Sequence, residues 1–152
     1  MLLRGRDGSE LELHVLGYQF PDTVDDPWEA NRLLVALRVV APAGSWEVAD
    51  PCLTTYEGEE VAGWLAAVGA GAPLRRLALS EPNVSVRLAA ARPGSVTLAF
   101  DFELEERPPW GPTSGAHRLG VEVTVGGWEV ATAAADLAQE LSRFPSRADP
   151  PE

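Results

Sequence analysis

The chain has 152 residues, 23 acidic and 12 basic, and a formal net charge of −11. A surface this negative repels phosphate backbones, so the composition predicts basic protein partners and no nucleic acid. Every basic residue is an arginine, which excludes the phosphate-loop lysine and all lysine-based catalysis.

The cysteine count and the lack of a long apolar run limit the class of protein further. Cys52 is the only cysteine, so no intrachain disulfide can form. Arg4 interrupts the N-terminus before an apolar stretch reaches signal-peptide length, and no segment has the apolar length of a membrane span. We therefore expect one cytoplasmic domain over residues 1–145, with residues 146–152 as a flexible C-terminal tail.

The N-terminal third predicts three strands and one long loop. Residues 11–15 alternate apolar with charged or polar side chains, as in a half-buried strand, and residues 18–31 form the loop. Residues 33–40 are nearly all apolar, which predicts a central strand covered on both faces. Residues 45–53 are expected to pair back, with Pro51 confining the far end to a sheet edge.

Helical periodicity appears twice. Over residues 56–69 apolar side chains recur at helical spacing, and Thr54 and Glu57 have the spacing of a capping box. A second amphipathic pattern covers residues 129–144 and ends before Pro145. Two helices therefore need a sheet to cover their apolar stripes.

Antiparallel strands are expected between the helices, over residues 74–80, 83–90, 95–105 and 116–125. Successive strands joined by turns predict an α+β domain with a mostly antiparallel sheet of about six to seven strands.

The strand over residues 95–105 has an acidic face. Its apolar residues point to one side, and Asp101, Glu103 and Glu105 point to the other. Alternate carboxylates on a strand lie about 6.5 Å apart and cannot hydrogen-bond directly. This face could be a solvated surface, a partner-binding surface, or the site of a small carboxylate- or metal-dependent hydrolase.

Other catalytic signals are weak. The glycines of Gly69–Leu74 lack the third glycine of a dinucleotide loop and follow a helix instead of a strand. Cys52 could meet His14 or His117 in space, but nothing near it lowers the thiol pKa, and we interpret it as a small buried apolar residue. We interpret His14, beside Glu12, as a surface hydrogen-bonding residue. The sequence thus predicts no catalytic residue, no metal and no cofactor.

Two of the five tryptophans lie in acidic loops that contain proline. Trp28 and Trp110 either pack on the sheet as loop anchors or serve as aromatic anchors for a basic partner. The candidate partner-binding residues are Asp25, Asp26, Trp28, Glu103, Glu105, Glu106 and Trp110.

Several segments in order resemble a known family. They are GYQFPDTVDDPWEANRLLV from Gly17, GSWEVADPCLTTYE from Gly44, LSEPNVSV from Leu79, FELEERPPW from Phe102, and a last helix that closes on RFP. Together they are similar to the bacterial WapI-type immunity proteins over residues 11–144.

The resemblance implies a non-enzymatic cytoplasmic antidote that binds and neutralises the toxic C-terminal domain of a polymorphic toxin. An acidic inhibitor would suit a toxin with a basic active face. A hydrolase that uses Asp101, Glu103 and Glu105 remains the alternative, and an adaptor module is a third possibility.

Overall fold

The computed structural model describes residues 1–149 except 78, 82 and 111–117, and in this part of the chain eight strands form two four-stranded antiparallel sheets. The elements in chain order are β1 (Leu2–Arg4), β2 (Glu10–Tyr18), α1 (Pro27–Asn31), β3 (Arg32–Ala41), β4 (Gly44–Thr54), α2 (Thr55–Gly69), β5 (Arg76–Leu77), β6 (Val84–Arg92), β7 (Ser95–Glu103), the 3₁₀ turn η1 (Leu104–Glu106), β8 (Arg118–Val125) and α3 (Gly127–Leu141). The α+β prediction is confirmed.

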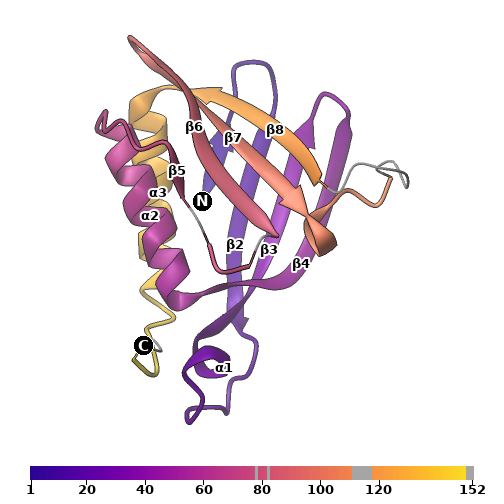
Figure 1. Cartoon of the computed structure of the whole chain (residues 1–152), viewed down its shortest axis with the longest axis vertical. Coiled ribbons are helices and arrows are strands. Elements are labelled where there is room, and N and C mark those ends of the chain that lie inside the picture. The colour runs from indigo at the N-terminus through magenta and orange to yellow at the C-terminus, as the bar shows by residue number, and fades with distance from the viewer. Residues whose placement is uncertain (78, 82, 111–117, 150–152) are drawn as a thin grey trace.

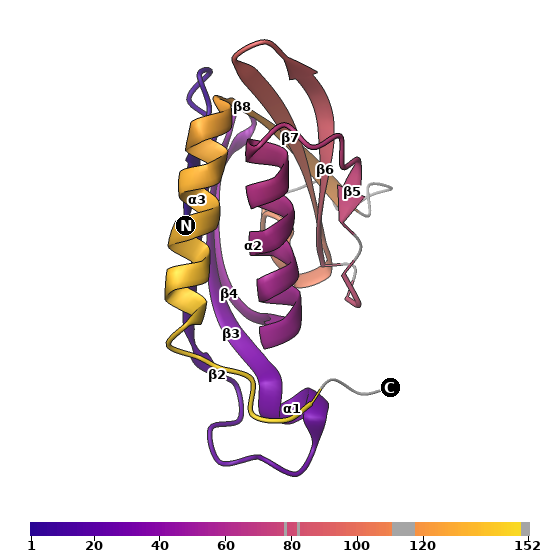
Figure 2. The ribbon, with the colours of Figure 1, turned by 90° about the vertical axis from the view of Figure 1, so that its left-hand side faces the viewer.

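The two sheets face each other on one side of the molecule, and α2 and α3 run side by side along the other (Figures 1 and 2). The first sheet has the order β1-β2-β3-β4 and the second the order β5-β6-β7-β8. The ring of Trp46 on β4 meets the ring of Phe102 on β7 edge to face, 5.4 Å between centroids. This contact joins the inner faces of the two sheets within one apolar core.

The sheet predicted from the sequence is divided in two because α2 interrupts the series of strands. Strands β1 to β4 pair with their sequence neighbours before α2, and β5 to β8 do so after it. Alternation and turns predict pairing between neighbouring strands, but they carry no information on pairing across an intervening helix.

Strand β3 is central, as predicted, but only one of its faces is deeply buried. Val35, Leu37 and Val39 point into the core, whereas Ala36 is half-buried and Arg38 is exposed. Both helices lie together on one side, so the outer face of the first sheet is left uncovered (Figure 2). The prediction from the apolar run, that both faces of this strand are covered, is therefore wrong for its outer face.

Several element boundaries also differ from the sequence prediction. Strand β7 ends at Glu103, because the chain then turns into η1, and α3 covers Gly127–Leu141 instead of residues 129–144. The short helix α1 lies within the expected loop. Its first turn is capped by Asp26, whose carboxylate accepts from the backbone N–H groups of Trp28 and Glu29 at 2.8 and 2.9 Å.

Helix α2 begins with the predicted capping box. The backbone N–H of Glu57 donates to the Thr54 hydroxyl at 3.2 Å, and the backbone N–H of Thr54 donates to the Glu57 carboxylate at 2.9 Å. The same carboxylate accepts from the backbone N–H and the hydroxyl of Ser80, at 2.7 and 2.5 Å. One buried side chain thus connects the end of β4, the start of α2 and the segment before β6.

None of the helices within the described residues is long and apolar enough to cross a membrane.

Helices α2 and α3 approach each other through glycine. A methyl group at Gly69 would lie 2.9 Å from the backbone nitrogen of Ala131 and 2.9 Å from the backbone oxygen of Gly127. At Gly63, in the same helix, a methyl group would meet nothing within 4 Å. The two positions make a matched pair for testing the packing of the helices.

We expect Gly69→Ala to lower the free energy of unfolding by about 1–3 kcal/mol, because the methyl group forces two backbones apart. Gly63→Ala should raise it by up to about 1 kcal/mol, because alanine restricts the unfolded chain and favours helix. Urea denaturation of both variants measures the difference. Equal stability of the two variants would contradict the close approach at Gly69.

Candidate functional site

The long loop and α1 lie at one end of the molecule (Figure 1), and their side chains form an exposed acidic and aromatic surface. We call it the α1 patch; its residues are Val24, Asp25, Asp26, Trp28 and Glu29, all exposed. The side chain of Trp28 is 49% exposed and that of Val24 59%. Large apolar side chains among carboxylates are typical of a protein-binding surface.

A cleft of about 260 Å³ lies beside Trp28, at the Thr54 end of β4. Its lining comes from α1, the start of β3, the end of β4, the start of α2 and the segment before β6: Trp28, Glu29, Arg32, Pro51, Cys52, Leu53, Thr54, Glu57, Ser80 and Glu81. Arg32 forms an ion pair with Glu81 at this cleft. The sequence did not identify Arg32 or Glu81, because their meeting depends on how the second sheet packs against the first.

The second predicted aromatic anchor is more firmly packed. The Trp110 ring lies edge to face on Trp46, 6.0 Å between centroids, and its indole N–H donates to the backbone oxygen of Ser45 at 3.3 Å. A methyl group at Gly44 would come within 2.7 Å of the same ring. Trp110 is therefore a loop anchor that remains 45% exposed.

Trp28 and Trp110 lie at opposite ends of β4. Trp28 borders the cleft at Thr54, whereas Trp110 covers Gly44 and Ser45. Strand β4 has 11 residues, and at about 3.3 Å per residue the two tryptophans are roughly 25–30 Å apart. The structure does not bring the two aromatic loops together.

Glu103 and Glu105 lie next to the segment that borders the cleft. The backbone N–H of Glu103 donates to the backbone oxygen of Asn83 at 2.8 Å, and the Asn83 amide lies 3.4 Å from the Glu105 carboxylate. Asn83 is two residues beyond Glu81, so these carboxylates extend the acidic surface from the cleft towards η1.

Glu106 was expected at a partner-binding surface, but its side chain is buried. It is 0% exposed, because η1 turns it inward. Among the described residues, neither of its carboxylate oxygens has a hydrogen-bond partner. Burial, together with the Asp50 carboxylate beside it, raises the pKa of the Glu106 carboxyl to about 7.

The acidic strand does not hold its three carboxylates on one face. Asp101 and Glu103 remain on β7, where Asp101 lies 3.9 Å from Arg118, while Glu105 leaves the strand in η1. Within the described part of the chain, no three His, Cys, Asp or Glu side chains are grouped to hold a metal ion. The hydrolase alternative gains no support from this arrangement.

The thiol of Cys52 is 5% exposed, as its apolar interpretation predicted. Burial raises the pKa of Cys52, and Glu106 and Asp50 add to the shift, so the thiol remains protonated. His117, the more distant candidate for a dyad, lies outside the described residues.

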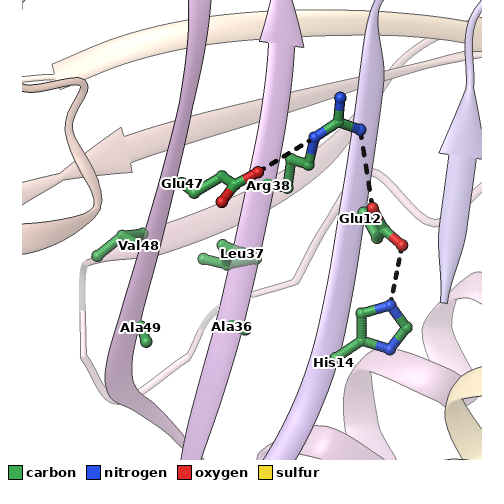
Figure 3. A pocket seen from close by; sticks show the side chains of 8 residues that line it. All are labelled: Glu12, His14, Ala36, Leu37, Arg38, Glu47, Val48 and Ala49. Atoms are coloured by element: carbon green, nitrogen blue, oxygen red, sulfur yellow. Dashed lines mark hydrogen bonds and ion pairs between the residues drawn. The ribbon is translucent and has the colours of Figure 1, made fainter.

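His14 belongs to an ion-pair network on the outer face of the first sheet (Figure 3). Its Nε2 lies 2.9 Å from Glu12 and its Nδ1 lies 3.3 Å from Glu140, and Arg38 lies 3.8 Å from Glu12 and 3.4 Å from Glu47. The hydrogen bond with Glu12 raises the pKa of His14, burial opposes it, and Glu140 adds to the rise. The network surrounds a shallow depression of about 380 Å³ and holds His14 at the surface, as predicted.

One exposed tryptophan was not a predicted site residue. Trp128 lies on the first turn of α3 and is 74% exposed. No acidic and proline-rich loop surrounds it, so the signal that singled out Trp28 and Trp110 was missing here.

Residues 1–145 match the model of the immunity protein WapI-like family. Nearly the whole chain is therefore covered by the match, including the α1 patch, the cleft and η1. A search of curated proteins finds no match.

The buried Glu106 carboxyl predicts a pH dependence of stability. Its pKa is raised from 4.5 to about 7 in the folded state, so the folded protein binds this proton more tightly than the unfolded chain. Its contribution to the free energy of unfolding is full below about pH 4.5 and is lost as the pH rises through about 7, on the order of 3 kcal/mol in all.

We expect Glu106→Gln to reduce the fall in the free energy of unfolding between about pH 5 and pH 8. Urea denaturation as a function of pH measures this fall. Glu105→Gln, which removes an exposed carboxylate next to it, should leave the slope unchanged. An unchanged slope in the Glu106 variant would rule out a protonated carboxyl at this position.

Proposed function

The chain belongs to the WapI-like immunity protein family, and from this premise we propose that it binds and neutralises the toxic C-terminal domain of a bacterial polymorphic toxin. The family implies a protein toxin as partner. We propose further that the protein acts in the cytoplasm, without catalysis, by forming a stoichiometric complex that covers the toxin's functional face.

The observation that carries the proposed surface is the α1 patch. It combines Val24 and Trp28, both about half exposed, with the carboxylates of Asp25, Asp26 and Glu29. An apolar side chain that enters a pocket of the partner can supply much of the binding energy. The surrounding carboxylates would attract a basic toxin face and increase the rate of encounter, in keeping with the net charge of −11.

The size of a typical interface limits which residues an interface centred on the α1 patch can include. A standard interface buries about 800 Å² on each partner and is therefore about 30 Å across. Centred on Trp28, it would include the cleft and extend towards Glu103 and Glu105. Trp110, roughly 25–30 Å away, would lie beyond the edge of an interface of this size.

The function is tested by purifying the toxin C-terminal domains encoded in the source genome and measuring their binding to this protein. We expect one basic domain to bind with 1:1 stoichiometry, with affinity that falls as salt is raised, and its toxicity to be abolished by co-expression. The double variant Asp25→Asn, Asp26→Asn should associate more slowly at low salt and keep the helix cap, because asparagine also caps. Failure of every domain to bind or be neutralised would refute the proposal.

Replacement of Trp28 with alanine should weaken binding of that domain by about 2 kcal/mol or more, which is roughly 30-fold. Trp128→Ala provides the matched control, because it removes an even more exposed tryptophan from a different surface and should leave affinity unchanged. Isothermal titration calorimetry measures both variants. Equal losses, or no loss for Trp28→Ala, would place the interface elsewhere.

A further inference from the structure

We infer that Arg147, which lies beyond the family match over residues 1–145, is a positioning residue that holds the long loop before α1 in its binding conformation. The inference rests on the proposed function, because it assigns the α1 patch to toxin binding. The sequence predicts a flexible tail over residues 146–152, whereas residues 146–148 make several hydrogen bonds to α1, α2 and this loop.

The Arg147 side chain contacts the loop directly. The central carbon of its guanidinium lies over the ring of Tyr18, 3.4 Å from the ring centroid. The same group donates to the backbone oxygens of Phe20, at 3.3 Å, and Pro21, at 2.7 Å. A planar guanidinium can stack and donate at the same time, so these contacts hold the start of the loop to the end of β2.

The backbone of the same segment is held by a buried amide. Asn31 is 0% exposed and its Oδ1 accepts from the backbone N–H of Arg147 at 2.8 Å. Its Nδ2 donates to the backbone oxygen of Pro27 at 2.7 Å, to the Tyr56 hydroxyl at 2.6 Å and to the backbone oxygen of Ala148 at 3.2 Å. One side chain therefore ties α1, α2 and the C-terminal segment together.

These polar contacts matter because the loop has little apolar packing of its own. Val24 is exposed, and Phe20 is only partly buried. In the loop itself, the backbone N–H of Gln19 donates to the backbone oxygen of Arg32 at 2.8 Å, and that of Thr23 donates to the backbone oxygen of Phe20 at 3.3 Å. Segments with few buried apolar contacts open locally at low cost. Loss of Arg147 should therefore increase the mobility of the loop that carries Asp25 and leads into Trp28.

A mobile loop must be ordered when the toxin binds, and that cost lowers affinity. The contacts of Arg147 order the loop in the free protein, so that less ordering is needed when the toxin binds. Since Arg147 contacts the ring of Tyr18 and the backbone of Phe20 and Pro21, a change there could adjust affinity without altering the side chains of the α1 patch themselves.

The test compares Arg147→Ala with Arg143→Ala, which removes the same charge from an exposed position four residues earlier. Hydrogen exchange of the free protein should become about tenfold faster over residues 19–29 in Arg147→Ala and should not change in Arg143→Ala. Exchange in β3, β7 and α2 should be the same in both variants, which separates a local effect from general destabilisation. Arg147→Lys keeps the charge but not the planar fork and should give an intermediate result.

The same variants are then titrated with the basic toxin domain retained in the experiment above. We expect Arg147→Ala to bind about tenfold more weakly, mainly through faster dissociation, and Arg143→Ala to bind like the wild type. Unchanged exchange over residues 19–29 would overturn the positioning role, and faster exchange with unchanged affinity would overturn its link to recognition. If the wild type bound no toxin domain, the proposed function would fail, while the exchange difference would still decide the positioning role.

Discussion

One buried carboxylate, that of Glu57, bridges the two halves of the structure. It accepts hydrogen bonds from Thr54 at the end of β4 and from Ser80 before β6, and it belongs to the first turn of α2. Burial alone would raise the pKa of Glu57, but the hydrogen bonds from Ser80 and Thr54 outweigh it and lower the pKa. Within the described residues no strand pairing joins the two sheets, so this ionised side chain helps to hold them in one orientation and to position the cleft that it lines.

The two ends of the molecule are held by different forces. Apolar side chains of both sheets and both helices fill the interior, where Trp46 and Phe102 connect the sheets. The end that carries α1 depends instead on polar contacts of Asn31, Asp26 and Arg147. Directional polar contacts set the position of a loop precisely, yet each is individually weak.

The sequence by itself determined the class of elements, the capping of α2 and the electrostatic character. Alternation in β2 and β7 and helical spacing in α2 and α3 are local patterns, and each appears in the structure with boundaries shifted by a few residues. The capping box at Thr54 and Glu57 also depends only on spacing along the chain. Charge is a sum over residues, so an excess of acidic over basic side chains needs no structure to be recognised.

Only the tertiary structure decided which of these side chains lie together and which lie inside. Glu105 and Glu106 are adjacent in sequence, yet η1 exposes the first and buries the second. Trp28 and Trp110 have the same local composition but lie at opposite ends of β4, and Arg147 is held in place by Asn31, 116 residues away. These outcomes depend on contacts between segments distant in the chain, and a local pattern contains no information about such contacts.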